Sequence, residues 1–259
     1  MGGAMLEGIV KGNKNVECCF FDTSEGRCAE LAAALSLEAE KSIAAVMARS
    51  RGVILGVKPQ VYPSVAGEVA ESYREGQLLI SIMAGIPIAA MAETLPPSAK
   101  ILRLMPNMAM SVGKGVCLLC ANENVTAEEK AQIMEILSVM GLVKEIPEER
   151  MDIGTAISGS GPAFFYTMVE AMMFGAVQGG FSCPDGLELV IHTMKGAAAL
   201  LEETGLPPGT LRDQMMSAGG TTVEGLCALE NGSFRRDVID AVAAATRRSR
   251  ELSGGCDKK

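Results

Sequence analysis

The chain has 259 residues, of which 48% are hydrophobic and 21% charged, a balance typical of globular proteins. A net charge of −8, the absence of tryptophan and an aromatic content of 4% argue against a nucleic-acid partner. Neither a membrane-length apolar run nor a signal-peptide pattern is evident. We therefore expect a soluble, cytoplasmic protein that binds neither nucleic acid nor membrane.

The first half of the sequence alternates apolar runs with helical patterns. A helical start over residues 1–10 is followed by Val16–Phe21, which is predicted to be a buried strand ending at Asp22. Further strands are predicted over 52–57, 77–82, 101–105, 116–120 and 142–146, with helices over 24–35, 43–49, 63–73, 88–93 and 127–140. This alternation predicts an α/β fold with a doubly wound, mostly parallel, Rossmann-like sheet.

An acidic residue that ends a strand after a glycine pair is half of a dinucleotide-binding fingerprint. Gly2, Gly3 and Asp22 supply that half, whereas the strand and the G-x-G that open the motif are not in the sequence. From these residues alone, a plain helix–strand beginning explains the pattern equally well.

Three predicted strand ends carry residues suited to a ligand: Val57–Gln60, Ser81–Gly85 and Arg103–Asn107. Each is also explained as a simple turn, since proline or glycine occurs in all three. Ligands of parallel sheets bind beyond the carboxyl ends of the strands. We therefore expect these three segments to line one shared cleft.

The composition changes after Pro147, where strand patterns give way to helices rich in alanine, glycine and methionine. Helices are predicted over residues 155–177, 184–203, 208–216, 221–230 and 235–252. The small residues Ser158–Pro162 suit the close approach of a flat ligand or of another helix. We expect a cofactor domain over residues 1–148 and an all-α domain over 149–259, whose apolar helix faces favour a homodimer.

The segment Ser217–Thr222 places two glycines between hydroxyl residues immediately before a helix. Glycines let main-chain N–H groups converge, and the helix start adds further unpaired donors, so that a small carboxylate or phosphate is held there. The alternative is an ordinary helix cap in which Thr221 or Thr222 bonds the first turn.

The eight cysteines do not predict a metal site or a disulfide framework. Cys117 and Cys120 form the one C-x-x-C, but within a strand they point to opposite faces. We expect buried, reduced thiols. The single histidine, His192, has no metal-ligand partners in its segment.

Five segments together resemble the pyrroline-5-carboxylate reductase family: VKPQ (57–60), ISIMAGI (80–86), LRLMPN (102–107), TAISGSGPAFFY (155–166) and the stretch from SAGGTT to RSREL (217–252). The resemblance implies an N-terminal nicotinamide-dinucleotide domain and a C-terminal helical domain that dimerises. It also implies reduction of 1-pyrroline-5-carboxylate to L-proline by NADPH or NADH, the last step of proline biosynthesis.

The resemblance further implies roles for particular residues. The substrate carboxylate is expected on the loop formed by Ser217, Gly219, Gly220, Thr221 and Thr222, with Thr222 as the catalytic residue that bonds the ring nitrogen. The expected cofactor-binding residues are Met1, Gly2, Asp22, Thr23, Ser24, Gly56, Val57, Lys58, Pro59, Ile82, Met83, Ala84 and Asn107. Asp22 suits the ribose hydroxyl of NAD, whereas Thr23, Ser24 and Arg27 suit NADP, so both cofactors stay open.

The sequence departs from the family pattern at three places. It begins at the methionine that follows G-x-G in the motif, so we expect a start assigned too late or a truncated chain. Met108, Ala109 and Met110 replace the last three residues of the usual MPNTPA, and Ala218 replaces a proline. Two alternatives remain: an inactive paralogue acting as a dimerisation module, or an imine or β-hydroxyacid dehydrogenase, for which Lys195 is the lysine available in the helical region.

Overall fold

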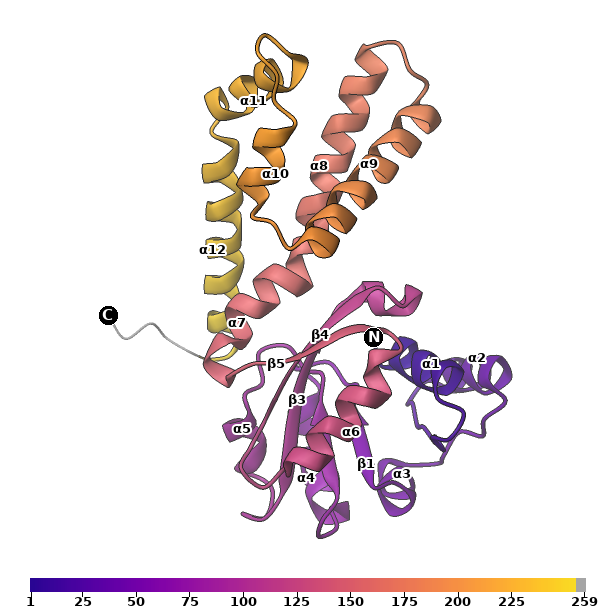
Figure 1. The fold of residues 1–259 in the computed structure, drawn as a ribbon. Coiled ribbons are helices and arrows are strands. Elements are labelled where there is room, and N and C mark those ends of the chain that lie inside the picture. The colour runs from indigo at the N-terminus through magenta and orange to yellow at the C-terminus, as the bar shows by residue number, and fades with distance from the viewer. Residues whose placement is uncertain (255–259) are drawn as a thin grey trace. The chain divides into compact units, whose positions relative to one another are not determined.

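The computed structural model describes residues 1–254, which form two compact units (Figure 1). Among the described residues, the sheet unit comprises residues 1–159 and 245–254, and the helical unit comprises Ser160–Ala244. The functional boundary expected at residue 148 remains a prediction. In the described part of the chain, no helix has the length and apolar character needed to cross a bilayer.

The sheet unit contains one five-stranded sheet in the order β1-β2-β3-β4-β5. The strands are β1 (Gly52–Leu55), β2 (Leu78–Ser81), β3 (Lys100–Pro106), β4 (Gly115–Ala121) and β5 (Gly141–Glu145). The first three are parallel, β4 is antiparallel to β3, and β5 is parallel to β4. The carboxyl ends of β1, β2 and β3 and the start of β4 therefore share one edge, which we call the carboxyl edge.

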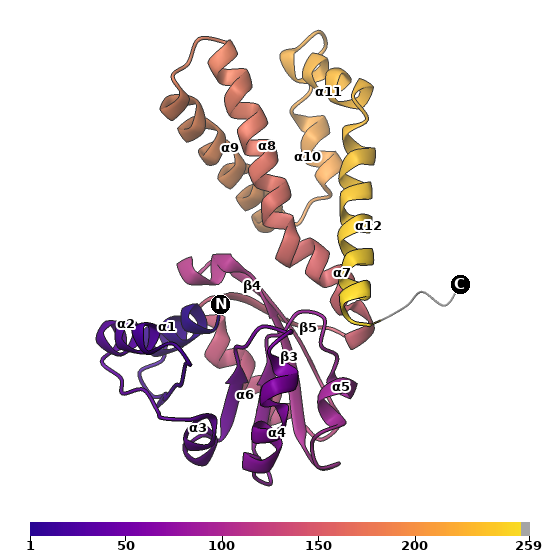
Figure 2. The ribbon, with the colours of Figure 1, turned by 180° about the vertical axis from the view of Figure 1, so that it is seen from behind.

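Alternating side chains build a hydrophobic core on each face of the sheet. Leu79 and Ile101 point into a core covered by α3 (Ile43–Arg49), α4 (Tyr62–Ser72) and α5 (Ile88–Ala92). Ile80 and Leu102 point into the opposite core, which is covered by α1 (Gly2–Gly12) and α6 (Ala127–Ser138). Figures 1 and 2 show these helices on the two faces, so the predicted doubly wound, mostly parallel sheet is confirmed.

The prediction of a strand over Val16–Phe21 is wrong, because this segment is not part of the sheet. Only Phe20 forms a β-bridge, with Ala39, and the Glu40 N–H donates to the Phe20 carbonyl at 2.7 Å. The apolar side chains of the segment are nevertheless used, because Phe20 packs with residues of α2 (Glu25–Leu35) in a small third core. Apolar character predicted the burial, whereas a strand also requires a ladder of partner hydrogen bonds.

The predicted helices after residue 150 are confirmed, with one local difference at the start. A single helical run contains α7 (Met151–Gly154), a π-helical turn (Thr155–Ser160) and α8 (Gly161–Gln178). Pro162 has no N–H to donate to the Ser158 carbonyl four residues earlier, which favours a local departure from α geometry. The later helices are α9 (Cys183–Thr204), α10 (Pro208–Gln214), α11 (Thr221–Asn231) and α12 (Phe234–Leu252).

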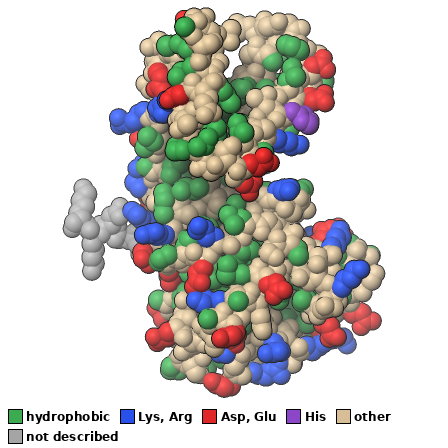
Figure 3. Space-filling model, in the orientation of Figure 1, with side chains coloured by type: hydrophobic (Ala, Val, Ile, Leu, Met, Phe, Trp, Pro, Cys, Tyr) green, Lys and Arg blue, Asp and Glu red, His purple; other side chains and the backbone are tan. Residues whose placement is uncertain are grey.

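The helical unit leaves many large apolar side chains exposed. Helices α8 and α9 pack against each other as an antiparallel pair. Green side chains gather over this unit on the face drawn in Figure 3. The exposed large apolar residues include Phe165, Tyr166, Phe174, Leu189 and Ile239.

Two tyrosines of the sheet unit allow a test of hydrogen bonding in the core. The hydroxyl of Tyr62 is buried without a hydrogen-bond partner among the described residues. An unpaired buried polar group costs about 1–3 kcal/mol, so Tyr62→Phe is expected to raise the free energy of unfolding by about 1 kcal/mol.

Tyr73→Phe is the matched control for this experiment. The Tyr73 hydroxyl donates to the Gln77 carbonyl at 2.8 Å and accepts from the Lys100 N–H at 3.2 Å. Its removal is expected to lower the free energy of unfolding by about 1–2 kcal/mol. Urea denaturation compares the two variants, and equal destabilisation by both would contradict this account.

Candidate functional site

The start of α1 meets the ends of β1 and β2 at the carboxyl edge. A Cβ placed on Gly56 would lie 3.3 Å from the Gly2 Cα and 4.0 Å from the Ile82 Cδ1. Met1, whose side chain is exposed, precedes this contact, and its carbonyl accepts from the Met5 N–H at 3.0 Å. Main-chain atoms therefore approach one another closely, beside the unpaired N–H groups of the first helical turn. This arrangement suits a phosphate group.

The predicted Asp22–Ser24 segment lies exposed at the start of α2. The Ser24 N–H donates to Asp22 Oδ1 at 2.9 Å, and Ser24 Oγ caps the helix by accepting from the Arg27 N–H at 3.3 Å. Arg27 pairs with Glu30 at 2.9 Å and lies against Gly3, where a Cβ would be 2.7 Å from its Nη2. An acidic and a basic side chain thus occur at the same helix start, next to α1.

The two other predicted segments have different degrees of exposure. Lys58 is exposed at the end of β1, and its carbonyl accepts from the Val61 N–H at 2.9 Å. Met83 is buried, with its N–H donating to Ser81 Oγ at 3.2 Å, whereas Ala84 is exposed. The predicted residues at the ends of β1 and β2 therefore combine a fixed main chain with three exposed positions, Gly56, Lys58 and Ala84.

Asn107 is predicted as a cofactor-binding residue. In the structure its side chain joins three segments of the sheet unit by hydrogen bonds. Its side chain is buried; Nδ2 donates to the Ser158 carbonyl at 2.8 Å, and Oδ1 accepts from the Val116 N–H at 3.2 Å. These bonds join the end of β3, the start of β4 and the π-helical turn. The Ser158 carbonyl would ordinarily accept from the N–H of residue 162, but Pro162 has none. The Asn107 amide supplies the missing donor.

An ion pair between a buried arginine and a half-buried glutamate, which sequence reasoning missed, lies near the same edge. Arg103 is 5% exposed and pairs with Glu148 at 3.1 Å, and Glu148 Oε1 also accepts from the Ile88 N–H at 2.9 Å. Glu148 therefore ties the start of α5 to β3. The sequence gives no signal for this pairing, because the two partners are far apart along the chain and no motif contains both.

In the helical unit, Ser217–Thr222 forms a glycine turn before α11. Gly219 has φ +68°, Gly220 is the N-cap, and the Gly220 N–H donates to the Ser217 carbonyl at 2.9 Å. A Cβ on Gly220 would lie 2.3 Å from Ser217 Oγ and 3.0 Å from its carbonyl oxygen, so a larger residue there would require the Ser217 side chain to move. The alternative of a threonine cap is wrong, because Thr221 and Thr222 lie inside the helix and the cap has no side-chain hydrogen bond. The first-turn amides of α11 therefore have no capping side chain.

The described residues contain no cluster of three or more histidine, cysteine, aspartate or glutamate side chains that would hold a metal. Burial raises the pKa of the Cys117 thiol to about 12, and burial, followed by the charge of Glu148, raises that of Cys120 to about 12. These thiols therefore stay protonated and unreactive at neutral pH. The expected burial is wrong for Cys183 and Cys227, which are exposed, while Cys256 lies outside the described residues.

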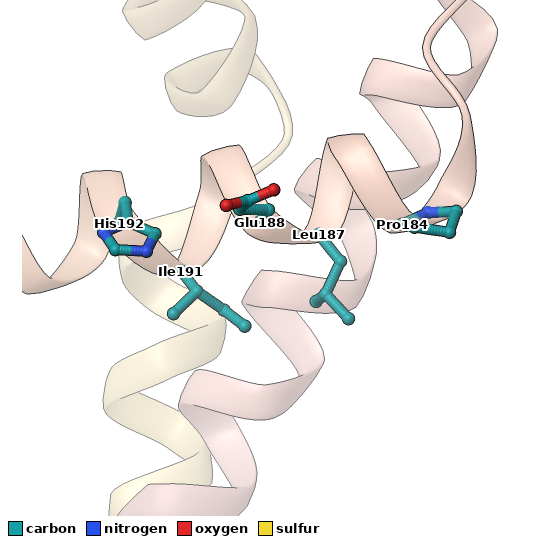
Figure 4. A pocket seen from close by; sticks show the side chains of 5 residues that line it. All are labelled: Pro184, Leu187, Glu188, Ile191 and His192. Carbon is teal, nitrogen blue, oxygen red and sulfur yellow. The ribbon is translucent and has the colours of Figure 1, made fainter.

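A hollow of about 310 Å³ lies on the α9 surface and is separate from the glycine turn in sequence. Figure 4 shows Leu187 and Ile191 extending to the same side of the helix, with Glu188 and His192 at its margin. A single imidazole and a single carboxylate beside an apolar surface are better suited to protein packing than to catalysis. Lys195, on the same helix, is exposed.

The structural role of the Asn107 hydrogen bonds is testable by Asn107→Asp. A carboxylate oxygen would replace the amide donor and face the Ser158 carbonyl, so the free energy of unfolding is expected to fall by about 2–3 kcal/mol. Protonation restores a donor, so this loss is expected to shrink as the pH falls. Urea denaturation at neutral and acidic pH measures both effects. A loss that is the same at both pH values would show that the bond to Ser158 is not responsible.

Comparison with known proteins agrees with this two-part organisation. A family model described as pyrroline-5-carboxylate reductase dimerisation matches residues 148–252, and one described as NADP oxidoreductase, coenzyme F420-dependent, matches residues 1–85. The pyrroline-5-carboxylate reductase of Methanosarcina acetivorans is 35% identical over 97% of this chain and 94% of its own length. That of Synechocystis is 39% identical over 78% of this chain and 75% of its own length.

Solved structures show the same relationship. The Plasmodium falciparum pyrroline carboxylate reductase, crystallised with NADP bound, is 31% identical and has a TM-score of 0.88 over 98% of this chain and 94% of its own. The Coxiella burnetii pyrroline-5-carboxylate reductase is 30% identical and also has a TM-score of 0.88, over 97% and 96% of the two chains. Because identity above 30% extends over nearly the whole of both chains, the resemblance found in the motifs is confirmed, and the protein belongs to the pyrroline-5-carboxylate reductase family.

Proposed function

We propose that this protein reduces 1-pyrroline-5-carboxylate to L-proline with NADPH or NADH. Family membership supports this reaction, and the single structural observation that carries it is the glycine turn at the start of α11. That turn offers main-chain donors for a small carboxylate without a competing side-chain cap. The substrate is a small ring that bears such a carboxylate.

The proposed substrate site uses main-chain amides for binding and a hydroxyl for orientation. The N–H groups of Gly219 and Thr221 hold the carboxylate. The Gly220 N–H bonds the Ser217 carbonyl and, with the Ser217 side chain packed against Gly220, keeps the turn in shape. Amides fixed by a helix start need no reorganisation when the anion binds. A carboxylate held in this way fixes the position of the ring that carries it.

Thr222 is the proposed catalytic residue. Reduction of the C=N bond adds a hydride to carbon and a proton to nitrogen, and a threonine hydroxyl is too weak an acid to supply that proton alone. Thr222 therefore orients the ring nitrogen by a hydrogen bond, or relays a proton to it from water. The chemistry that NAD(P)H supplies when bound is the hydride.

The proposed cofactor residues gather at the carboxyl edge of the sheet. A Cβ on Gly2 would lie 3.5 Å from the Gly56 Cα, so these glycines let the start of α1 pack directly against the end of β1, which supports the close main-chain approach that a pyrophosphate site requires. Asp22, Thr23 and Ser24 would contact the ribose, while the Gly56–Pro59 and Ile82–Ala84 segments would line the dinucleotide. Asn107 would contribute mainly by holding the π-helical turn and the start of β4 in place through its hydrogen bonds.

The proposed assembly is a homodimer formed through the helical unit. Exposed aromatic and aliphatic side chains on α8, α9 and α12, together with the hollow beside Leu187 and Ile191, support this proposal. A second copy would cover such a surface. A functional division near residue 148 and a cytoplasmic location belong to the same proposal.

The proposed reaction is tested by mixing the full chain with 1-pyrroline-5-carboxylate and following the oxidation of NADPH and of NADH. Substrate-dependent oxidation with formation of proline is expected. The absence of oxidation with both cofactors, under conditions in which a relative is active, would favour the inactive dimerisation module.

The role of Thr222 is tested by Thr222→Ala, with Thr222→Ser as the conservative control. Loss of the hydroxyl is expected to lower kcat by about 100-fold, since one orienting or proton-relaying group contributes that order of magnitude. Thr222→Ser is expected to stay within about threefold of the wild type, because it keeps the hydroxyl. The dissociation constant of NADPH should be nearly unchanged in both. Equal kcat in wild type and Thr222→Ala would contradict the assignment of Thr222 as the catalytic residue.

Cofactor preference is tested by Asp22→Asn. Removing the negative charge is expected to lower the KM for NADPH by about fivefold and to raise the KM for NADH, because a 2′-phosphate is repelled by a carboxylate and a ribose hydroxyl is bound by it. Glu123→Gln makes the same charge change at an exposed position between β4 and α6 and should alter neither constant. If both variants change the ratio equally, the effect comes from net charge and not from Asp22.

A further inference from the structure

The loop that follows β2 is held at both of its ends. Its first part contains Ile82, Met83 and Ala84, which belong to the proposed cofactor site. At its far end the Ile88 N–H donates to Glu148 at 2.9 Å, and Glu148 is anchored by the buried Arg103. Between these points lies Gly85, with φ +77°.

The last turn of α12 covers the middle of this loop. A Cβ on Gly85 would lie 3.0 Å from the Leu252 carbonyl oxygen and 3.1 Å from its carbonyl carbon. Two stretches of main chain are therefore in contact, so the position of the loop follows the position of the helix end. Both belong to the sheet unit, because that unit includes the chain from Ala245 onward.

A buried serine fixes the end of α12 to α7. Ser249 is 8% exposed, and its Oγ donates to Asp152 Oδ1 at 2.6 Å. Ser253 Oγ makes a longer contact of 3.5 Å with the same carboxylate oxygen and bonds the Ser249 carbonyl at 3.0 Å. Figures 1 and 2 both draw this end of α12 beside α7.

We infer that Ser249 and Asp152 are positioning residues for cofactor binding, which act by holding the last turn of α12 against the Ile82–Gly85 loop. The inference rests on the proposed function, in which this loop lines the dinucleotide. Neither residue is a catalytic residue. Their hydrogen bond orders the loop before the cofactor arrives, so that less conformational entropy is lost on binding.

The test compares Ser249→Ala, Asp152→Ala and the double variant in the full chain. The dissociation constant of NADPH is expected to rise about fivefold to tenfold in each single variant and no further in the double variant, because both single changes remove one hydrogen bond. Amide hydrogen exchange over residues 82–86 is expected to become about tenfold faster without ligand, while exchange over β2 stays unchanged.

Two further variants separate positioning from general stability. Ser249→Thr keeps the hydroxyl and should restore NADPH binding to within about twofold of the wild type. Ser138→Ala removes a similar serine bond, from Oγ to the Glu135 carbonyl at 2.7 Å, at the exposed end of α6, and should change neither binding nor exchange. If Ser249→Ala does not fold, Ser253→Ala leaves the Ser249–Asp152 bond in place, removes the longer contact and the bond to the Ser249 carbonyl, and should weaken NADPH binding about twofold.

An unchanged NADPH dissociation constant in Ser249→Ala, or an equal change in Ser138→Ala, would overturn the inference. So would normal exchange over residues 82–86 in a Ser249→Ala variant that folds. If the wild type itself does not bind NADPH, the proposed function fails, while the exchange measurement still decides whether α12 holds the loop.

Discussion

The proposed binding surfaces depend on main-chain atoms that approach one another more closely than side chains allow. At the carboxyl edge, Gly2 and Gly56 bring the start of α1 against the end of β1. In the helical unit, Gly219 and Gly220 turn the chain so that the first amides of α11 are left without a cap. Binding by main-chain donors is insensitive to side-chain rotamers, so the geometry is set by the fold itself. The side chains around these points mainly keep the backbone in place.

The sheet and its two faces were predictable because buried strands and helices produce regular patterns of apolar residues in the sequence. Cys117 and Cys120 illustrate this, since strand alternation predicts opposite faces and the two thiols lie in opposite cores. The same logic failed for Val16–Phe21, because apolar runs report burial and contain no information about a hydrogen-bonded neighbour. The glycine turn was predicted from its residue types, although the threonine cap that they equally permitted does not form.

Contacts between distant polar residues could not be predicted from one sequence. Asn107 with Ser158, Arg103 with Glu148, and Asp152 with Ser249 each join segments whose local patterns give no indication of the partner. Their existence follows from packing, which leaves a buried carbonyl, guanidinium or carboxylate that must find a partner. The π-helical turn has a similar origin, because Pro162 removes one helical donor and the side chain of Asn107, which follows β3, replaces it.

The return of α12 to the sheet unit also affects how the protein is made. The loop after β2 leaves the ribosome well before the helix turn that covers it, because the two are far apart along the chain. At ordinary elongation rates the interval is on the order of ten seconds. During that time the nascent sheet unit lacks one of its supports, so synthesis of α12 is a precondition for finishing its N-terminal half.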